Sequence, residues 1–310
     1  MQIERIGTLQ TDLGECPLWD AAAGMLWMLD CRHGHLLTVD PASGEHVHRA
    51  LPAPVGSVAF NGPDSLVVAL RNDVAIYTPS RGTLRRVASI DDRHDNLRLN
   101  DGAAMPDGSF VVGTMHVFRD PGEAPLGGLY RLAPDGKFSR LDQGLGVVNG
   151  PVAHPWKAEC YVCDSEARMI YRYRMSAEGA WLAREPFVDT APYQSAPDGC
   201  CFDDAGGLWT ALVRAGAIAR FDAEGRLTHH IALPVAHPAS LCFGGPELDD
   251  LFVTTIRSSG RLAADGPLDG ALLRIRGTGW RGAPRPHCRI ELPANQAPTE
   301  GFTVAAPDFP

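Results

Sequence analysis

Short apolar runs recur along the whole chain and are separated by turns rich in Gly, Pro, Asp and Asn. No long stretch repeats its apolar residues at the 3.6-residue period of an amphipathic helix, so we expect few helices. The runs fall into six similar units, and each unit opens with an apolar strand, a turn and a second apolar strand. These openings begin at Cys16, Ser57, Gly102, Gly150, Gly199 and Ser240.

A third strand follows each opening, and in most units a polar turn and a fourth strand come next. Six four-stranded units of about 50 residues each predict an all-β protein, a six-bladed β-propeller. The segment from Ile3 to Leu9 precedes its unit and resembles the outer strands, so it is predicted to close the ring by pairing with the sixth blade. Residues 1–292 are predicted to form the propeller and residues 293–310 an irregular tail.

The composition narrows the choice of partner and compartment. The formal net charge is −9 and Lys and Arg form no cluster, which argues against nucleic acid or an anionic membrane and favours small molecules or proteins. The first residues, MQIERIGTLQ, lack the apolar core of a signal peptide, and no apolar run approaches the ~20 residues of a membrane span. We therefore expect a cytoplasmic protein whose eight cysteines stay reduced and mostly buried.

Two pairs of cysteines invite comparison with a zinc site. Cys160-Tyr-Val-Cys163 has the spacing of half a zinc motif, but Cys200-Cys201 lacks the two-residue spacer and no His-x3-His segment follows. We therefore interpret all four as small buried side chains.

The order of strands within a blade decides which residues share one face of the ring. If the innermost strand leaves a face, the second strand returns to it, the third leaves and the fourth comes back. The linkers into the innermost strands therefore ring the central axis on one face, and the loops between second and third strands edge the same face. The linkers contain Gly14-Glu15, Val55-Gly56, Arg98 to Asp101, Val148-Asn149, Pro197-Asp198 and Ala236-His237.

The tripeptide Pro-Asp-Gly occurs three times, and its aspartates are Asp107, Asp135 and Asp198. Asp107 and Asp135 lie between strands of their own blades, where a reverse turn is required. Asp198 instead lies at the entry of an innermost strand. Its place in the repeat therefore predicts a role in a site rather than in a turn.

Glu15, Asn149 and Asp198 are predicted to point into one axial cavity from blades one, four and five. Two carboxylates gathered in a cavity repel each other unless a cation compensates. An all-oxygen set suits a hard divalent ion, Ca²⁺, Mg²⁺ or Mn²⁺, with Zn²⁺ as a further candidate. The alternative is that Glu15 is a rim residue and the other two serve in turns. Their equivalent positions in the repeat favour the metal site.

Blade three adds polar groups to the same face. Arg98 suits an oxygen-rich, partly anionic ligand, and Asn100 either contacts substrate or forms a turn. For Asp101 two roles stay open, an ion pair with Arg98 or support of a water on the metal. His116 ends the second strand of blade three and His237 leads into blade six, and each either reaches the ligand or lies on the surface.

Two connections on this face are longer than the others, HVFRDPGEAPLGG after Met115 and IRSSGRLAADGPLDG after Thr255. Both are predicted to act as lids that set substrate choice. The GxSxG motif of serine hydrolases is absent, which favours water as the nucleophile.

Several of these segments together resemble one protein family. They are LGECPLW, RLNDGAAMPDGSFVVGTM, VVNGP, APDGCCFDDAGGLWTAL and SLCFGGPELDDLFVTT. They are similar to the signature segments of the senescence-marker-protein/gluconolactonase family, which includes regucalcin and bacterial sugar lactonases. The similarity runs from Leu13 to about Trp280.

The resemblance implies a six-bladed propeller that holds one divalent metal. It implies Glu15, Asn149 and Asp198 as metal ligands and Arg98 and Asn100 as substrate contacts. It further implies Asp198 as the general base.

The sixth-blade segment and its long loop look more like the bacterial aldonolactonases than the animal members. The chain departs from some relatives after Gly-Thr-Met, where they place a substrate-binding glutamate. Here Phe118 stands at that position, with His116 and Arg119 beside it.

These features predict metal-assisted hydrolysis of a sugar-acid lactone, such as glucono-, galactono- or xylonolactone, to the aldonic acid. Asp198 would activate the water and the cation would polarise the carbonyl. One alternative is an esterase or phosphotriesterase on the same fold and metal. Another is a non-catalytic propeller that binds calcium or a protein. The missing WD and kelch signatures and the axial gathering of polar residues favour an enzyme.

Overall fold

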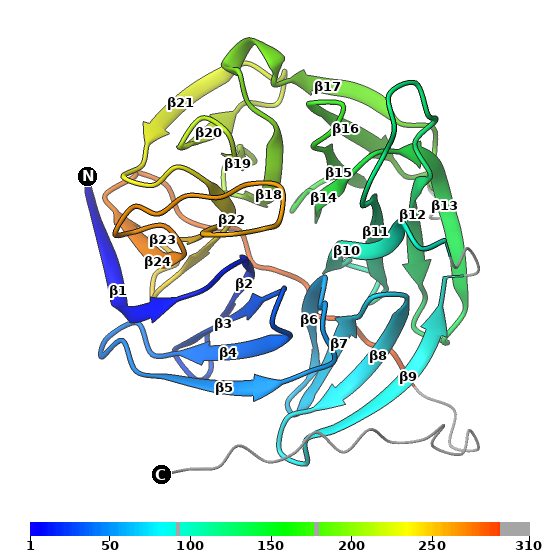
Figure 1. Cartoon of the computed structure of the whole chain (residues 1–310), viewed down its shortest axis with the longest axis horizontal. Coiled ribbons are helices and arrows are strands. Elements are labelled where there is room, and N and C mark those ends of the chain that lie inside the picture. The colour runs from blue at the N-terminus through cyan, green and yellow to red at the C-terminus, as the bar shows by residue number, and fades with distance from the viewer. Residues whose placement is uncertain (91–93, 177–179, 292–310) are drawn as a thin grey trace.

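The computed structural model describes residues 1–90, 94–176 and 180–291. Within these ranges, six four-stranded antiparallel sheets are arranged in a ring (Figure 1), so the predicted six-bladed β-propeller is confirmed. The helical content of the described residues is one 3-10 turn, η1 (Ala191–Tyr193), and no helix in them is long and apolar enough to cross a membrane. The tail predicted at 293–310 lies outside the described residues.

From the centre outward, the first three blades consist of β2 (Gly14–Asp20), β3 (Met25–Asp30), β4 (His35–Val39) and β5 (His46–Ala50); β6 (Ser57–Gly62), β7 (Ser65–Ala69), β8 (Asp73–Thr78) and β9 (Thr83–Ser89); and β10 (Leu97–Ala104), β11 (Phe110–His116), β12 (Gly127–Leu132) and β13 (Phe138–Leu145).

The other three blades consist of β14 (Val148–Ala153), β15 (Glu159–Asp164), β16 (Met169–Arg174) and β17 (Glu185–Asp189); β18 (Pro197–Phe202), β19 (Leu208–Leu212), β20 (Ala217–Phe221) and β21 (Leu227–Ala232); and β22 (Pro238–Gly244), β23 (Asp250–Thr255), β24 (Ala271–Arg276) and β1 (Gln2–Gln10).

The inner strands are largely buried, whereas the outer strands are more exposed. Every residue of β18 and β22 is buried, while none of β5 is fully buried. Neighbouring blades pack face to face through apolar side chains, as where the Trp209 ring of blade five meets the edge of Phe243 of blade six. This burial explains why the six openings read as nearly continuous apolar runs.

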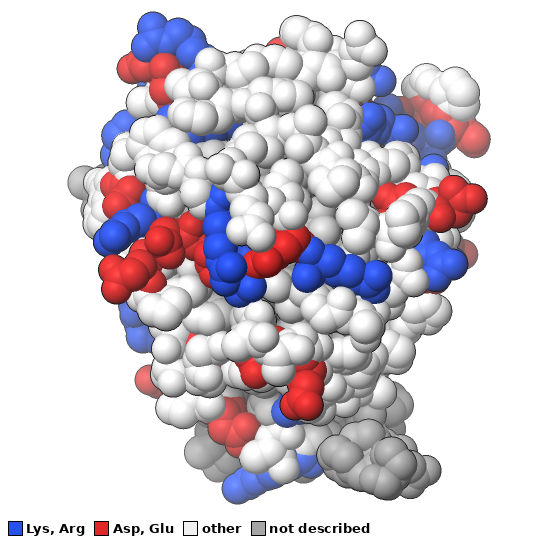
Figure 2. Space-filling view, turned by 90° about the vertical axis from the view of Figure 1, so that its left-hand side faces the viewer, with Lys and Arg blue, Asp and Glu red and all other residues white. Residues whose placement is uncertain are grey.

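The N-terminal strand closes the ring, as predicted. β1 pairs antiparallel with β24, from Gln2 opposite Arg276 to Arg5 opposite Leu273. Glu4 Oε1 lies 2.6 Å from Arg274 Nη2 and 3.2 Å from Arg276 Nη1. On this side of the ring, acidic and basic side chains are intermixed and neither sign forms a wide patch (Figure 2).

After β24 the chain crosses the central opening toward blades two and three (Figure 1), a course that the sequence did not predict. We call residues 282–291 the strap. Their backbone N–H groups donate to carbonyls of several blades, with acceptors that include Leu248, Phe202, Phe60, Gly108 and Pro134. These acceptors lie where inner strands or, for Pro134, a third strand end, so the strap connects the blades on the face opposite the strand entries.

Candidate active site

The predicted site residues lie together at the entry of the inner strands. Glu15 is on β2, Arg98 and Asn100 are on β10, Asn149 is on β14 and Asp198 is on β18. The sequence assigned them to linkers, whereas the structure has them in the first residues of the strands. Because neighbouring inner strands contact each other around the ring, these side chains come from adjoining parts of one channel.

Each of these four strands changes register where it carries the site residues. The shifts fall between Glu15 and Leu18, Leu99 and Gly102, Asn149 and Val152, and Pro197 and Cys200. A β-bulge turns a side chain away from the regular alternation of a strand and is common beside active sites. The bulges therefore explain how strands that are otherwise packed with apolar residues present polar groups to the axis.

Two backbone positions beside the candidate ligands adopt the left-handed conformation. Cys16, after Glu15, has φ 51° and Gly150, after Asn149, has φ 49°. The Asp101 carboxylate holds both positions, because it accepts from Cys16 Sγ at 3.3 Å and from the Gly150 N–H at 2.7 Å. A left-handed φ is unfavourable for a cysteine. The hydrogen bonds to Asp101 therefore maintain a strained backbone next to the site.

A chain of hydrogen bonds connects blades three, four and five across the site. Arg98 Nη1 donates to Asn100 Oδ1 at 2.9 Å, and Asn100 Nδ2 donates to Asn149 Oδ1 at 2.8 Å. Asn149 Nδ2 in turn donates to Ser165 Oγ at 2.8 Å, and Ser165 donates to the Pro197 carbonyl at 2.7 Å. This chain orients the Asn149 amide and anchors the residue that precedes Asp198.

Burial dominates the electrostatics of the carboxylates. It raises the pKa of Glu15 well above its usual range, and the Asp198 and Asp101 carboxylates raise it further, while Arg98 partly opposes the shift. Burial and then Asp101 likewise raise the pKa of Asp198 well above normal. Among the described ion pairs none joins Arg98 to Asp101, the pairing considered from the sequence. The protein's own cations therefore compensate these carboxylates incompletely.

The donor set suits a hard divalent cation. Asp198 Oδ1 is buried and has no hydrogen-bond partner among the described residues, a costly arrangement for a carboxylate oxygen. Glu15 and Asn149 supply further oxygens, and such sets favour Ca²⁺, Mg²⁺ or Mn²⁺. No group of three or more His, Cys, Asp or Glu side chains in the described ranges is arranged to hold a metal ion. The candidate set contains only two such residues, Glu15 and Asp198, because its third member is an asparagine. The metal site remains a prediction that the donor chemistry fits.

The other two Pro-Asp-Gly aspartates lie in turns, in agreement with the sequence analysis. Asp107 accepts from the Ser109 N–H and Oγ and pairs with Arg131 at 2.6 Å. Asp135 accepts from the Lys137 N–H at 3.0 Å. Of the three, only Asp198 lies buried in an inner strand.

The two long connections meet above the site. They run over residues 117–126, between β11 and β12, and 256–270, between β23 and β24. Arg261 of the second donates to the His116 carbonyl at 3.0 Å and to the Val117 carbonyl of the first. A pocket of about 180 Å³ lies beneath them and is lined by residues that include Arg98, Met115, Phe118 and Arg261.

Neither predicted histidine lines this pocket. The His116 ring is fully buried, with its Nε2 3.7 Å from Glu123 Oε2 and its ring near His94. The His237 ring nitrogen Nδ1 lies 2.8 Å from the Val213 carbonyl oxygen. Substrate contact by either ring therefore remains a prediction from the sequence.

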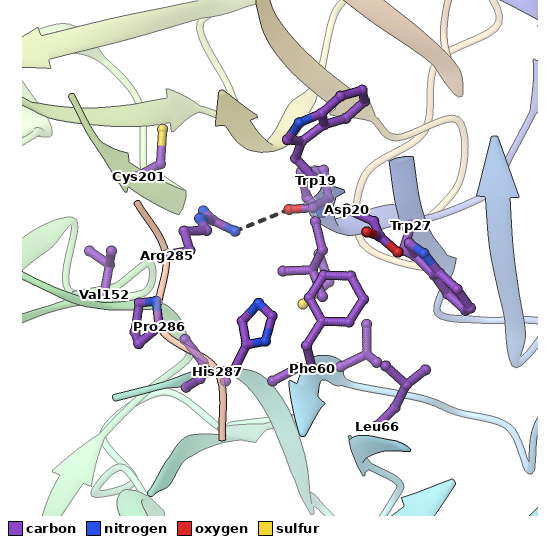
Figure 3. A pocket seen from close by; sticks show the side chains of 18 of the residues that line it. Trp19, Asp20, Trp27, Phe60, Leu66, Val152, Cys201, Arg285, Pro286 and His287 are labelled. Atoms are coloured by element: carbon purple, nitrogen blue, oxygen red, sulfur yellow. Dashed lines mark hydrogen bonds between the residues drawn. The ribbon is translucent and has the colours of Figure 1, made fainter. Parts of the chain in front are cut away.

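A larger cavity of about 990 Å³ lies at the opposite end of the channel (Figure 3). Aromatic side chains such as Trp19 and Phe60 line it, and the strap runs along it. Its central cation, Arg285, donates to the backbone carbonyls of Pro17, Cys200 and Leu241 at 3.1–3.4 Å.

The candidate ligands lie at the neck between the two hollows. On β2 and the residues before it, Leu13 lines the small pocket and Cys16 the large cavity, so Glu15 lies between them. On β10, Arg98 lines the small pocket and Asp101 the large cavity in the same way. Glu15 and Asp198, which line neither hollow, distinguish this neck from the larger cavity, whose volume alone would have made it the first candidate.

The sequence analysis missed three polar residues near the site, Ser165, Arg32 and Arg261. Ser165 joins the hydrogen-bond chain, and the two arginines line the pocket. All three belong to loops between second and third strands, which were expected to edge this face. Inspection of polar residues in those loops could have found them.

The cysteines form neither a disulfide nor a zinc cluster within the described residues, which contain all eight. Every one is free and buried. Cys163 Sγ and Cys200 Sγ lie 3.2 Å apart in the core. This agrees with their interpretation as small buried side chains.

Comparison with known proteins adds independent information. The family model described as SMP-30/Gluconolactonase/LRE-like region matches residues 13–257. Pentonolactonase XacC of Haloferax volcanii is 32% identical over 288 residues, which cover 89% of this chain and 94% of that protein. The 6-deoxy-6-sulfogluconolactonase of Pseudomonas putida is 30% identical over 267 residues, which cover 85% of this chain and 91% of that protein.

A solved structure shows the same fold. It is that of a calcium-binding protein, regucalcin, from Agrobacterium tumefaciens, with a TM-score of 0.82 and 24% identity over 93% of this chain and 97% of that chain.

Proposed function

Because the chain belongs to the SMP-30/Gluconolactonase/LRE-like family, we propose that it hydrolyses a sugar-acid lactone to the aldonic acid with the help of one divalent cation. The two similar proteins named as a pentonolactonase and a 6-deoxy-6-sulfogluconolactonase support the lactone as substrate class. The pocket of about 180 Å³ beside the buried carboxylates is consistent with a small molecule.

One observation carries the proposal: the buried Asp198 oxygen that has no partner in the described part of the chain. Glu15, Asn149 and Asp198 would hold the cation. When bound, the cation would polarise the lactone carbonyl and offset negative charge on its oxygen. A structural carboxylate in a core would be expected to have its hydrogen bonds satisfied, as those of Asp101 are.

Asp198 is the proposed general base. In its ionised form it takes a proton from a water molecule, whose oxygen then adds to the lactone carbonyl carbon. The bond between that carbon and the ring oxygen breaks, and the ring oxygen leaves as a hydroxyl after it takes from Asp198 the proton that Asp198 removed from the water. The products are one open-chain hydroxy acid and no other fragment.

Arg98 and Asn100 are proposed to orient the substrate. Arg98 lines the pocket, and the bond from its Nη1 to Asn100 Oδ1 fixes both side chains. Such positioning matters because a ring held out of line with the attacking water loses much of the gain from proximity.

The test is an assay of the purified protein after removal of metals with a chelator. Glucono-, galactono- and xylonolactone are offered with Mn²⁺, Zn²⁺, Ca²⁺ or Mg²⁺ restored, beside a panel of phosphotriesters and simple esters. We expect at least one lactone to be hydrolysed in the presence of a cation and hydrolysis to be lost without it. Full activity in the chelated protein would contradict the cation's role, and turnover of esters alone would contradict the lactone.

A further inference from the structure

The pocket beneath the two long loops carries more positive charge than a neutral lactone requires. Its lining includes the residues Arg32, Arg98 and Arg261 and, among the described residues, no Asp or Glu. We propose that the substrate is a lactone with a second acid group, a carboxylate, sulfonate or phosphate, at the end away from the lactone carbonyl. This inference rests on the proposed lactonase function and names its substrate class.

The three arginines come from distant parts of the chain. Arg32 lies in the turn between β3 and β4, Arg98 on β10, and Arg261 in the loop between β23 and β24. Arg32 Nη1 donates to Ser258 Oγ at 2.9 Å and Arg261 donates to the His116 carbonyl at 3.0 Å. The acceptors that the described residues offer these two groups are neutral, and no ion pair within the described ranges joins either group to a carboxylate. Both residues are exposed, so solvent rather than a protein carboxylate meets their charges.

A nearby arginine differs from these two because a carboxylate pairs with it. Arg119, on the first long loop, pairs with Glu166 at 2.9 Å and so has its charge balanced. Arg98 has Glu15 as its neighbouring carboxylate, but Glu15 belongs to the proposed cation site. A dication held by Glu15 and Asp198 would neutralise those two carboxylates. The guanidinium groups would then be left as an excess of positive charge in a chain whose formal net charge is −9.

The arrangement also sets a direction for the ligand. Arg98 lies beside the candidate cation ligands, whereas Arg261 belongs to a loop that covers the pocket and Arg32, in the turn between β3 and β4, bonds Ser258 of that loop. The lactone carbonyl would therefore face Glu15 and Asp198, and the second acid group would face the loops. Guanidinium groups bind carboxylate, sulfonate or phosphate oxygens through paired, charge-assisted hydrogen bonds.

The volume fits one small molecule. About 180 Å³ is below the ~300–1,000 Å³ of pockets that hold drug-sized ligands, so the pocket suits a smaller molecule. Phe118, which also lines the pocket, is 70% exposed and offers an apolar face to the carbon–hydrogen side of a sugar ring. A single sugar acid would satisfy both the size and this mixture of charge and aromatic surface.

The first experiment compares four 1,5-lactones that differ only at C6. One carries the neutral hydroxymethyl group of gluconolactone, and the others carry a carboxylate, a sulfonate or a phosphate ester. We expect kcat/KM for at least one charged lactone to exceed that of the neutral one by about tenfold or more, and the preference to weaken at high salt. The charged lactone with the highest value identifies the acid group. Equal or higher values for the neutral lactone would overturn the inference.

Variants of the arginines test whether these residues cause the preference for a charged lactone. In Arg261→Gln and in Arg32→Gln we expect the charged-to-neutral ratio of kcat/KM to fall about tenfold, and Arg261→Lys to restore part of it. Arg257→Gln is the matched control, because Arg257 lies on the same loop but points to Gln10 and does not line the pocket. Its ratio should equal that of the wild type. An equal loss for both kinds of lactone in Arg261→Gln would count against the proposal.

A titration without turnover separates this inference from the proposed reaction. Gluconate and its six-carbon dicarboxylate analogue, glucarate, are titrated calorimetrically into the protein with Mn²⁺ present. We expect glucarate to bind about tenfold more tightly, and Arg261→Gln but not Arg257→Gln to remove that difference. If glucarate bound more tightly as expected but no lactone were hydrolysed, the proposed reaction would be wrong and the anion site would still be supported. Equal binding of both acids would overturn the anion site itself.

Discussion

The two ends of the central channel are built from the same inner strands, but their chemistry is opposite. Near the end where the strands enter, Asp198 Oδ1 is buried without a partner in the described chain. At the strap end, Arg285 is matched to three backbone carbonyls and the walls are aromatic. Two indole N–H groups there, of Trp19 and Trp27, also lack partners, but they are neutral donors.

This difference indicates that the entry end of the ring carries the function and that the strap end contributes stability. A buried carboxylate oxygen without a partner lowers stability, so we expect it where binding or chemistry requires it. Changes at the entry end should therefore alter catalysis with little loss of stability. Changes at the strap end should do the reverse. Four predictions test this division.

The largest effect is expected for Asp198→Ala. Loss of the general base should lower kcat by about 10²–10⁴-fold, with the fold retained, in steady-state assays at saturating cation and lactone. Asp107→Ala is the matched control, because it changes the same tripeptide in a turn. It should keep its kcat and lose only about 1 kcal/mol of stability through its bonds to Ser109 and Arg131. Near wild-type kcat in Asp198→Ala would contradict the assignment.

The next effect concerns cation affinity. Asn100→Ala removes the 2.8 Å hydrogen bond to Asn149 Oδ1, and loss of a group that orients a ligand typically costs 10–100-fold in affinity. Titration of the chelated protein with Mn²⁺ measures this. Asn61→Ala at the strap end is the control, because Asn61 bonds the backbone of Ile290 instead. It should bind Mn²⁺ as the wild type does, and equal affinity in both variants would argue against the role of Asn100.

The third effect belongs to the strap end. Arg285→Met leaves the Pro17, Cys200 and Leu241 carbonyls without their donor, which should lower the free energy of unfolding by about 1–3 kcal/mol. kcat/KM should stay unchanged. Urea denaturation provides the measurement, and Arg281→Met provides the control, because its pair with Glu247 is exposed and worth about 0–1 kcal/mol. A loss of activity without a loss of stability would reverse the comparison.

The smallest effect appears in the protein without metal. The raised pKa values of Asp198 and Glu15 mean that the native state holds more protons than the unfolded state above the usual carboxyl range. Stability of the chelated protein should therefore fall as pH rises from that range toward neutral. Asp198→Asn should be more stable by about 1 kcal/mol at neutral pH, with a flatter pH profile, because the repulsion among carboxylates is reduced. Parallel profiles in thermal melts would refute this.

The positions of the candidate ligands could be predicted because they recur in the repeat. Glu15, Asn149 and Asp198 each stand just before the first apolar run of a unit, and a meander brings such positions to one face. The directions of individual side chains were harder to predict. The sequence left open whether His116 reaches the ligand or lies on the surface. In the structure its neighbours Met115 and Val117 line the pocket and its ring is buried beside Glu123. Which side of a strand faces a pocket depends on blade twist and loop packing.

By itself, the sequence determined the number of blades, the closing strand and the end of the ring where polar groups gather. Those features follow from local alternation of apolar and polar residues and from its repetition, which can be read without coordinates. Only the tertiary structure decided that Arg32, Arg98 and Arg261 share one pocket and that the strap crosses the other end. Contacts between such distant residues arise from ring closure and loop packing, and no local pattern encodes them.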